Sequence, residues 1–308
     1  MLVRLSFCLA CVVSMIPFAH AGEKSGVMAP YTKPTLIAHR GASAYAPEHT
    51  LPAYRLALEQ GADFVEPDLQ ITRDGVLVCL HDPRLERTTD VASHFPDRFR
   101  MEGGKKVWPV VDFTLAEIKT LDAGIRKDKK FAGTRVPTLQ EMIDLVKGKA
   151  GIIPETKGPE LYAARGFDMG KMLMDVLRSN GLDRPRADAR TPVIIQSFSL
   201  ESLKKLRQEQ GCKLPLVYLF GTANGLETAE GLKKLKETAD GIAPRKTVIH
   251  DHPELIRLAH EQGMSVTVWT CNEQQKGRFA SARAEMQHLL DLGVDAIFTD
   301  NPDQFPRK

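Results

Sequence analysis

A (β/α)8 TIM barrel with a small insertion after the second strand is the fold class that the sequence predicts. Eight short apolar or β-branched runs alternate with amphipathic segments over nearly the whole chain. These runs are almost continuously apolar, which is typical of a parallel sheet buried on both faces. The chain has 308 residues, a length that α/β barrels commonly fill as one domain. An open, doubly wound sheet is the competing arrangement.

The eight predicted strands are rich in aliphatic and β-branched residues, which suit a pleated and buried surface. Each is followed by a segment with helical periodicity, the order that a barrel requires. They cover residues 35–39, 64–70, 151–155, 193–197, 214–219, 241–244, 265–270 and 296–299.

Helices are predicted wherever apolar residues recur every three or four positions between these strands. The first has clear end signals, because Thr50 can cap it, Pro52 is tolerated in its first turn and Gly61 follows its last residue. The predicted helices cover residues 51–60, 162–180, 200–210, 225–237, 253–262 and 277–292.

One region departs from the alternation of strands and helices. The dipeptide Asp74-Gly75 suits a hairpin turn, so the strand at 64–70 is predicted to pair with residues 76–80. The polar stretch that follows, about residues 83–135, is predicted to be an insertion above the barrel mouth. Two short helices are predicted nearby, at residues 115–121 and 138–147.

The N-terminal segment has the features of a secretory signal peptide. An apolar run at residues 5–18 is followed by an Ala-His-Ala cleavage pattern at 19–21. The run is shorter than the roughly twenty residues that span a bilayer. We therefore expect cleavage of residues 1–21, in preference to lipidation at Cys11. Cleavage leaves residues 22–308 as a periplasmic or secreted barrel domain without a stable membrane anchor.

Composition and motifs exclude several classes of function. The chain has 42 basic and 39 acidic residues and a formal charge of +3. No basic run could follow a phosphate backbone, so no nucleic-acid partner is expected. The patterns GxGxxG, GxxxxGK, HExxH and GxSxG are missing, which argues against the usual nucleotide, P-loop, zincin and hydrolase-elbow sites. The sequence carries no signal of a particular oligomeric state.

Carboxylates lie where predicted strands end. Glu66 and Asp68 are two positions apart, so both project from the same face of a strand, and Glu155 ends the next barrel strand. Barrel active sites lie at the carboxyl ends of the strands. Three oxygen donors without a thiolate suit Ca²⁺ or Mg²⁺ rather than a structural zinc. The alternative is that each carboxylate forms a separate ion pair with Arg or Lys.

Two histidines are candidates for proton transfer at the same mouth. His39 ends the first strand and His81 follows the hairpin strand, and imidazole exchanges protons near neutral pH. Arg40 and Lys157 lie beside these elements and could hold an anionic substrate. The alternative for these two cations is ion pairing with nearby carboxylates, namely Glu48, Asp82 or Glu66.

The other histidines are predicted to be structural. His49, at a junction of loop and helix, is expected to support the fold, although it could reach a ligand. Asp251-His252 is interpreted as the capped start of a helix. Surface or packing roles are expected for the remaining histidines, which are His94, His250, His260 and His288.

One long motif resembles a known family. The stretch "IAHRGASAYAPEHTLPAYRLALEQGADFVEPDLQITRDGVLVCLHD" is similar to the glycerophosphodiester phosphodiesterases, particularly their periplasmic bacterial branch. The pattern continues through "RTTDV", "PETKGP", "IIQSFS", "VTVWTCN" and "GVDAIFTDNPD". The resemblance implies a TIM barrel and the metal-dependent hydrolysis of glycerophosphodiesters, such as glycerophosphocholine or glycerophosphoethanolamine, to glycerol 3-phosphate and an alcohol.

The resemblance also implies roles for residues at matching positions. The family's two catalytic histidines fall on His39 and His81. Its metal carboxylates fall on Glu66, Asp68 and Glu155, which would hold one divalent cation, Ca²⁺ or Mg²⁺.

The implied substrate-binding residues are Arg40, Lys157 and Trp269. Arg40 matches the arginine that contacts phosphate, Lys157 matches the lysine of a PExK element, and Trp269 lies where the family lines the glycerol side of the pocket. Pro67 lies between two implied metal ligands and cannot donate to a sheet, so a bend is expected there. Which histidine is the acid, and whether water or a substrate hydroxyl attacks, both stay open.

The sequence leaves two alternative functions open. A related barrel phosphodiesterase could act on phospholipids or on polyol-phosphate polymers. A protein of a different class could bind phosphodiesters without turnover, although binding alone does not need a pair of proton-transfer groups.

Overall fold

A computed structural model describes residues 31 and 34–307 of the chain. Its strands form a ring of eight parallel positions, two of which are each occupied by two short strands. The ring closes because its last strand pairs with both the strand before it and the first strand, and the two divided positions pair with each other. In order, the strands are β1 (Thr35–Ala38), β2 (Phe64–Val65) with β3 (Asp68–Ile71), β7 (Gly151–Ile152) with β8 (Glu155–Thr156), β9 (Ile195–Ser197), β10 (Leu216–Phe220), β11 (Gly241–Pro244), β12 (Ser265–Cys271) and β13 (Ala296–Thr299). The predicted (β/α)8 barrel is confirmed.

The second and third barrel positions are interrupted at prolines. Pro67 separates β2 from β3, and Pro154 lies between β7 and β8. A proline has no N–H to donate to a sheet, but its carbonyl still accepts, and Glu155 N donates to the Pro67 carbonyl at 3.0 Å. The strand is thus interrupted at Pro67, between Glu66 and Asp68.

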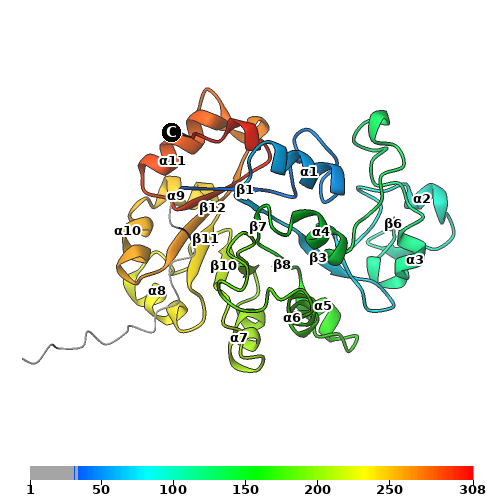
Figure 1. Ribbon diagram of the computed structural model, residues 1–308, viewed down its shortest axis with the longest axis horizontal. Coiled ribbons are helices and arrows are strands. Elements are labelled where there is room, and N and C mark those ends of the chain that lie inside the picture. The colour runs from blue at the N-terminus through cyan, green and yellow to red at the C-terminus, as the bar shows by residue number, and fades with distance from the viewer. Residues whose placement is uncertain (1–30, 32–33, 308) are drawn as a thin grey trace, which may run out of the picture.

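Helices surround the ring of strands, as Figure 1 shows. Side-chain caps fix several of their starts, and Thr138 with Glu141 forms a complete capping box at α4. The barrel helices are α1 (Leu51–Glu59), α4 (Leu139–Val146), α5 (Pro159–Ala163), α6 (Met169–Ser179), α7 (Leu200–Gln208), α8 (Ala229–Lys236), α9 (Lys246–Asp251), α10 (Glu254–Glu261) and α11 (Ala282–Asp291).

Two helix predictions are wrong. The single helix predicted at 162–180 is two helices, α5 and α6, because Gly166 adopts a positive φ of 82° that ends the first. Asp251 is the last residue of α9 and His252 is its C-cap, so this pair ends a helix rather than starting one. The short α9 was not predicted.

The insertion lies to one side of the barrel, at the right of Figure 1. It follows β4 (Leu77–Cys79), which pairs antiparallel with β3 as predicted. Besides a helix at the position predicted for 115–121, the insertion contains a second hairpin and a short helix that the sequence did not predict. The labels η1 and η2 mark two short 3-10 helices. Its elements are α2 (Val91–His94), β5 (Arg100–Glu102), β6 (Lys105–Val107), η1 (Val110–Asp112), α3 (Leu115–Ile118) and η2 (Lys129–Phe131).

Three clusters of buried apolar residues hold these parts together. One fills the barrel interior and includes Ile37, Val217 and Phe298. A larger one packs the strands against the helices. The third belongs to the insertion and includes Trp108 and Phe113. The insertion therefore has a packed core of its own.

The predicted signal peptide, residues 1–21, lies outside the described residues. Within residues 31 and 34–307, no helix is long and apolar enough to cross a membrane.

Candidate active site

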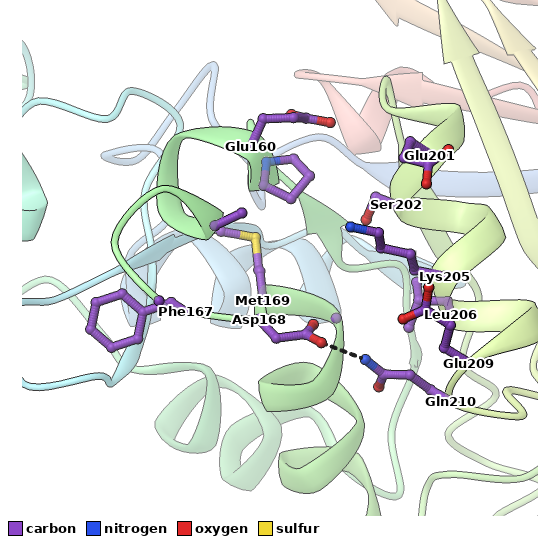
Figure 2. Close-up of a pocket in the computed structure, with 14 residues that line it drawn as sticks. Glu160, Phe167, Asp168, Met169, Glu201, Ser202, Lys205, Leu206, Glu209 and Gln210 are labelled. Atoms are coloured by element: carbon purple, nitrogen blue, oxygen red, sulfur yellow. Dashed lines mark hydrogen bonds between the residues drawn. The ribbon is translucent and has the colours of Figure 1, made fainter.

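Several cavities in the described part of the chain are large enough to hold a small molecule. One of about 390 Å³, beside β10, α7 and α8, contains none of the predicted site residues. Another, about 310 Å³, is a groove between α5, α6 and α7 (Figure 2). A hydrogen bond of 3.0 Å from Gln210 to Asp168 crosses it, and its lining contains none of the predicted site residues. A third cavity, about 250 Å³, is lined by all eight of them together with Phe198, Leu219, Thr270 and Phe298. Chemistry rather than size therefore selects this third cavity.

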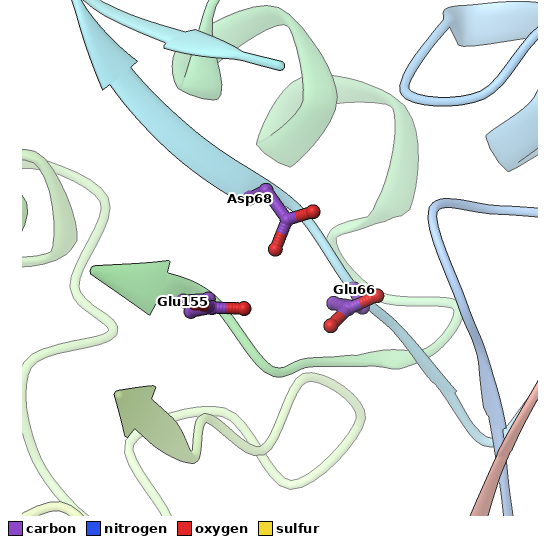
Figure 3. A group of neighbouring side chains, drawn as sticks. All are labelled: Glu66, Asp68 and Glu155. Atoms are coloured by element: carbon purple, nitrogen blue, oxygen red, sulfur yellow. The ribbon is translucent and has the colours of Figure 1, made fainter. Parts of the chain in front are cut away.

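The carboxylates of Glu66, Asp68 and Glu155 converge in this cavity. Figure 3 shows Asp68 and Glu155 on neighbouring strands and Glu66 on the segment that leads to Asp68, and one oxygen of each lies within 4.8 Å of the others. Glu66 follows β2, and the pairing of Asp68 with Glu155 brings β3 and β8 side by side. All three side chains are buried. The structure thus brings together the three carboxylates that the sequence singled out.

Burial and mutual repulsion oppose ionisation of two of the three carboxylates in this cluster. Burial and the charge of Asp68 raise the pKa of Glu66 to about 7 and the pKa of Glu155 well above its usual value. Lys157 Nζ lies 3.2 Å from Glu155 and Arg40 Nε lies 3.5 Å from Asp68. The alternative of separate ion pairs therefore holds for Asp68 and Glu155, whereas no Lys or Arg of the described residues forms an ion pair with Glu66.

One oxygen of the cluster has no donor. Asp68 Oδ1 is buried and receives no hydrogen bond from the part of the chain that the structure describes. A buried carboxylate oxygen without a partner is costly. Because a divalent cation would satisfy this oxygen and screen the repulsion, the three residues fit a hard metal ion with oxygen ligands.

Each predicted catalytic histidine is held by a carboxylate on its Nδ1 atom. His39 Nδ1 lies 2.6 Å from Asp300, just after β13, and His81 Nδ1 lies 2.6 Å from Asp82. A carboxylate at Nδ1 selects the tautomer with the proton on that atom, which leaves Nε2 free to exchange a proton. Both rings line the cavity.

The predicted substrate-binding residues occupy the same cavity. Trp269 donates its indole N–H to the Ala243 carbonyl at 2.8 Å, which fixes its ring. Phe198 packs edge-on against it with ring centroids 5.5 Å apart, and Lys157 Nζ lies 5.6 Å from the centre of the Phe198 ring. The alternative of ion pairing also holds in part for Arg40, which contacts Glu48 at 3.2 Å.

Comparison with known proteins shows which family the chain belongs to. The family described as "Glycerophosphoryl diester phosphodiesterase family" matches residues 39–304, which is most of the chain. The chain belongs to this family.

Relatives of the phosphodiesterase family match over nearly full length. A glycerophosphodiester phosphodiesterase of Bacillus subtilis is 34% identical over 300 residues, covering 94% of this chain and 91% of its own. One from Caldanaerobacter subterraneus is 32% identical, covering 88% and 96%. The chain is therefore an enzyme, a hydrolase of the glycerophosphodiester phosphodiesterase class.

Solved structures of phosphodiesterases agree with the fold. A phosphodiesterase from Oleispira antarctica, in complex with the product sn-glycerol-3-phosphate, has a TM-score of 0.70 at 25% identity and covers 88% of this chain and 95% of its own. A glycerophosphodiester phosphodiesterase from Agrobacterium tumefaciens has a TM-score of 0.64 at 27% identity, covering 88% and 98%.

His49 serves this phosphodiesterase as a buried support, as predicted. Its Nε2 lies 2.8 Å from Asp68 and its Nδ1 lies 2.9 Å from the Tyr54 hydroxyl. Burial lowers the pKa of His49 to about 4, so the ring is neutral at pH 7 and donates one hydrogen bond to the carboxylate. Although burial opposes ionisation, this contact helps to hold the pKa of Asp68 well below its usual value.

Asp300 is a functional candidate that sequence reasoning missed. Its Oδ1 contacts His39 and accepts from the Ser43 hydroxyl at 2.9 Å, and its Oδ2 accepts from Asn272 at 2.9 Å. The available signal was its place directly after the last strand, in "TDNP", where a polar residue would reach the barrel mouth. Gln196, which donates to Glu66 at 2.9 Å, was missed in the same way.

We expect Asp300→Asn to lower kcat by about 100-fold, within the range of general acid–base effects. Burial and Arg40 lower the pKa of His39, but Glu66 and Asp300 outweigh them and raise it. Loss of the Asp300 charge therefore lowers the pKa of His39 and moves its limb of the pH–rate profile to lower pH. Steady-state rates on glycerophosphocholine between pH 5 and 9 measure both effects. An unchanged kcat and an unmoved limb would show that Asp300 does not orient His39.

We expect Ca²⁺ to stabilise the protein more at pH 8 than at pH 5.5. A carboxyl with a raised pKa, such as Glu66, stabilises the metal-free fold at low pH, and this contribution is lost as pH rises through about 7. The cation binds the ionised form, so its effect grows over the same range. At about one hundred times Kd, the gain at pH 8 is about 5 °C in melting temperature. An equal gain in melting temperature at both pH values would contradict the interpretation that Ca²⁺ binds the ionised form of the carboxylate cluster.

Proposed function

We propose that the chain hydrolyses water-soluble glycerophosphodiesters, such as glycerophosphocholine and glycerophosphoethanolamine, to glycerol 3-phosphate and an alcohol, with one Ca²⁺ or Mg²⁺ ion. The observation that supports this most is the convergence of three buried carboxylates and two carboxylate-held histidines on one cavity of about 250 Å³. The solved relative that contains sn-glycerol-3-phosphate gives independent support for this product.

Phosphate binding is assigned to two cations beside the carboxylates. The Arg40 guanidinium suits phosphate oxygens, and Lys157 adds a compact charge beside Glu155. Glu66, Asp68 and Glu155 would hold the metal ion. When bound, a divalent cation supplies Lewis-acid polarisation of the phosphate and a template for its oxygens.

Proton transfer is assigned to His39 and His81. One Nε2 removes a proton from the attacking oxygen, which belongs to water or to a substrate hydroxyl, and the other gives a proton to the departing alcohol oxygen. Attack by water gives glycerol 3-phosphate directly, whereas attack by a substrate hydroxyl gives a cyclic phosphate that water then opens. Asp300 and Asp82 keep the Nδ1 protons in place, because each lies 2.6 Å from its histidine. The two carboxylates also stabilise the imidazolium that forms during each transfer.

The glycerol moiety is assigned to the aromatic wall of the cavity. Trp269 and Phe198 present apolar surface to the carbon atoms of the substrate, and both line the cavity. Lys157 Nζ lies 5.6 Å from the centre of the Phe198 ring, and the Arg245 guanidinium lies 5.8 Å from that of Trp269. Two positive charges therefore already lie at this wall. A neutral polyol fits here better than a cationic head group does.

We also propose that the enzyme acts in the periplasm or outside the cell, after removal of residues 1–21. The support is the cleavage pattern in the sequence. Expression of the full chain in a Gram-negative host tests this, with N-terminal analysis of the protein released by osmotic shock. Recovery of protein beginning at residue 22 supports export, whereas an intact N-terminus in the cytoplasm contradicts it.

The experiment that tests the proposed substrate class offers competing substrates to the purified enzyme. Glycerophosphocholine, phosphatidylcholine vesicles and a polyglycerol phosphate are incubated in turn with saturating Ca²⁺ or Mg²⁺, and glycerol 3-phosphate is detected through a coupled dehydrogenase, with choline measured alongside. We expect rapid release from glycerophosphocholine and little from the other two. Faster turnover of vesicles or polymer would replace the proposed substrate with a lipid or a polyol-phosphate chain.

A further inference from the structure

We propose that Arg87, in the insertion, is a positioning residue that holds the phosphate-binding Arg40 and the catalytic His81 in place through two shared carboxylates. The inference rests on the proposed functions of Arg40 and His81. It assigns to the insertion, which lies to one side of the barrel, a part in the reaction.

Three N–H groups of the Arg87 guanidinium are directed at carboxylates. Nη1 and Nη2 donate to the two oxygens of Glu48 at 2.8 and 2.6 Å, and Nε donates to Oδ2 of Asp82. Glu48 lies in the loop between β1 and α1, whereas Asp82 follows β4. One side chain therefore links two loops that are far apart in the sequence, in the paired geometry that makes Arg–carboxylate contacts strong.

Each of these carboxylates also holds a site residue. Glu48 Oε1 accepts from Arg40 Nη1 at 3.2 Å, and Asp82 Oδ1 lies 2.6 Å from His81 Nδ1. Because Arg87 occupies the other oxygen of Asp82, it fixes the carboxylate plane and leaves one oxygen directed at the histidine. In the same way, the double contact with Glu48 fixes the plane against which Arg40 rests.

The charges of this group are stable over the working pH range. Burial opposes ionisation of Glu48, but Arg87 and Arg40 together lower its pKa to about 2. Hydrogen bonds from His81 and Arg87 lower the pKa of Asp82 below its usual range. Both carboxylates are therefore ionised, and Arg87 offsets the repulsion that two anions would feel beside the site.

The backbone around Arg87 is anchored in the core of the insertion. Leu85 and Thr89 on either side are buried, and Leu85 N donates to the Trp108 carbonyl at 2.9 Å. Thr89 contacts the Leu85 carbonyl through its hydroxyl at 2.7 Å. The guanidinium is therefore presented by a rigid turn, which a positioning function requires.

The test compares Arg87→Lys and Arg87→Ala with a matched control, Arg84→Lys. Arg84 is as exposed as Arg87, at 46% against 45%, and forms a 2.6 Å ion pair, but its partner Glu102 lies within the insertion. Kinetic constants on glycerophosphocholine are measured with saturating Ca²⁺ or Mg²⁺, together with thermal unfolding. Methylguanidinium and methylammonium are added separately to Arg87→Ala.

We expect both Arg87 variants to lose about 10- to 100-fold in kcat/KM, the range for residues that orient functional ligands. Misplacement of His81 should lower kcat, and misplacement of Arg40 should raise KM. Millimolar methylguanidinium should restore activity to Arg87→Ala. Methylammonium should not, because it cannot donate two parallel hydrogen bonds to a carboxylate. We expect Arg84→Lys to stay within about twofold, as exposed pairs contribute little.

Three results would overturn the inference. One is a kcat/KM within twofold of the wild type in both Arg87 variants. Another is a loss explained fully by a smaller folded fraction, with normal kcat and KM in the remainder. The third is a loss that methylguanidinium does not reverse. Failure of the proposed function is distinguishable, because the wild type and His81→Ala would then release equal amounts of product, or none.

Discussion

Replacement of either His39 or His81 by alanine is expected to lower kcat on glycerophosphocholine by about 10³-fold or more, because each transfer of a proton contributes about 10²- to 10⁴-fold. The two rings line the cavity beside the carboxylate cluster, and each has its Nδ1 held by a carboxylate at 2.6 Å. Alanine removes the only group at each position that can accept and return a proton. KM should change much less than kcat, since the phosphate contacts of Arg40 and Lys157 remain.

The control for this prediction is His94→Ala, an exposed histidine of the insertion. All three variants should unfold within a few degrees of the wild type, as measured by circular dichroism. Near-normal kcat in either His39→Ala or His81→Ala would remove that residue from the acid–base pair. A comparable loss in His94→Ala would point to an artefact of preparation.

Glu155→Gln and Asp68→Asn are expected to weaken binding of the divalent cation by 10-fold or more and to lower kcat by about 100-fold or more, in line with the loss of a metal ligand or its support. Each substitution keeps the shape of the side chain and removes one negative charge from a cluster whose oxygens lie within 4.8 Å. Isothermal titration calorimetry with Ca²⁺ and with Mg²⁺ measures the affinity directly.

A second readout separates a metal site from a purely structural cluster. Relief of repulsion should leave the unfolding temperature of Glu155→Gln in chelator equal to that of the wild type, or higher, because burial and Asp68 raise the pKa of Glu155 well above its usual value. Glu160→Gln, an exposed neighbour, is the matched control. Unchanged affinity for both ions in Glu155→Gln and Asp68→Asn would exclude the cluster as the metal site.

The barrel and its mouth were predictable because both depend on local patterns. Continuous apolar runs, such as those at 241–244 and 296–299, were predicted with the bounds that β11 and β13 have in the structure. Residues that end such strands must lie at one edge of a parallel barrel. This is why Glu66, Asp68 and Glu155 could be grouped before their positions in space were known.

The rest depends on tertiary contacts that no local pattern encodes. Asp300 lies 261 positions from His39, and Arg87 lies 39 positions from Glu48. The hairpin of β5 and β6 has mostly exposed residues, so it lacks the apolar alternation that predicts a strand. The break between α5 and α6 was hidden because the flanking residues continue a helical periodicity across Gly166.

The most direct test of a metal-dependent phosphodiesterase is the release of glycerol 3-phosphate from glycerophosphocholine by the purified enzyme, before and after exhaustive chelation. We expect product formation to cease in chelator and to return when Ca²⁺ or Mg²⁺ alone is restored, and we expect Glu155→Gln not to recover with either ion. Product formation that continues unchanged after complete removal of metal would contradict the account and would require another function for Glu66, Asp68 and Glu155.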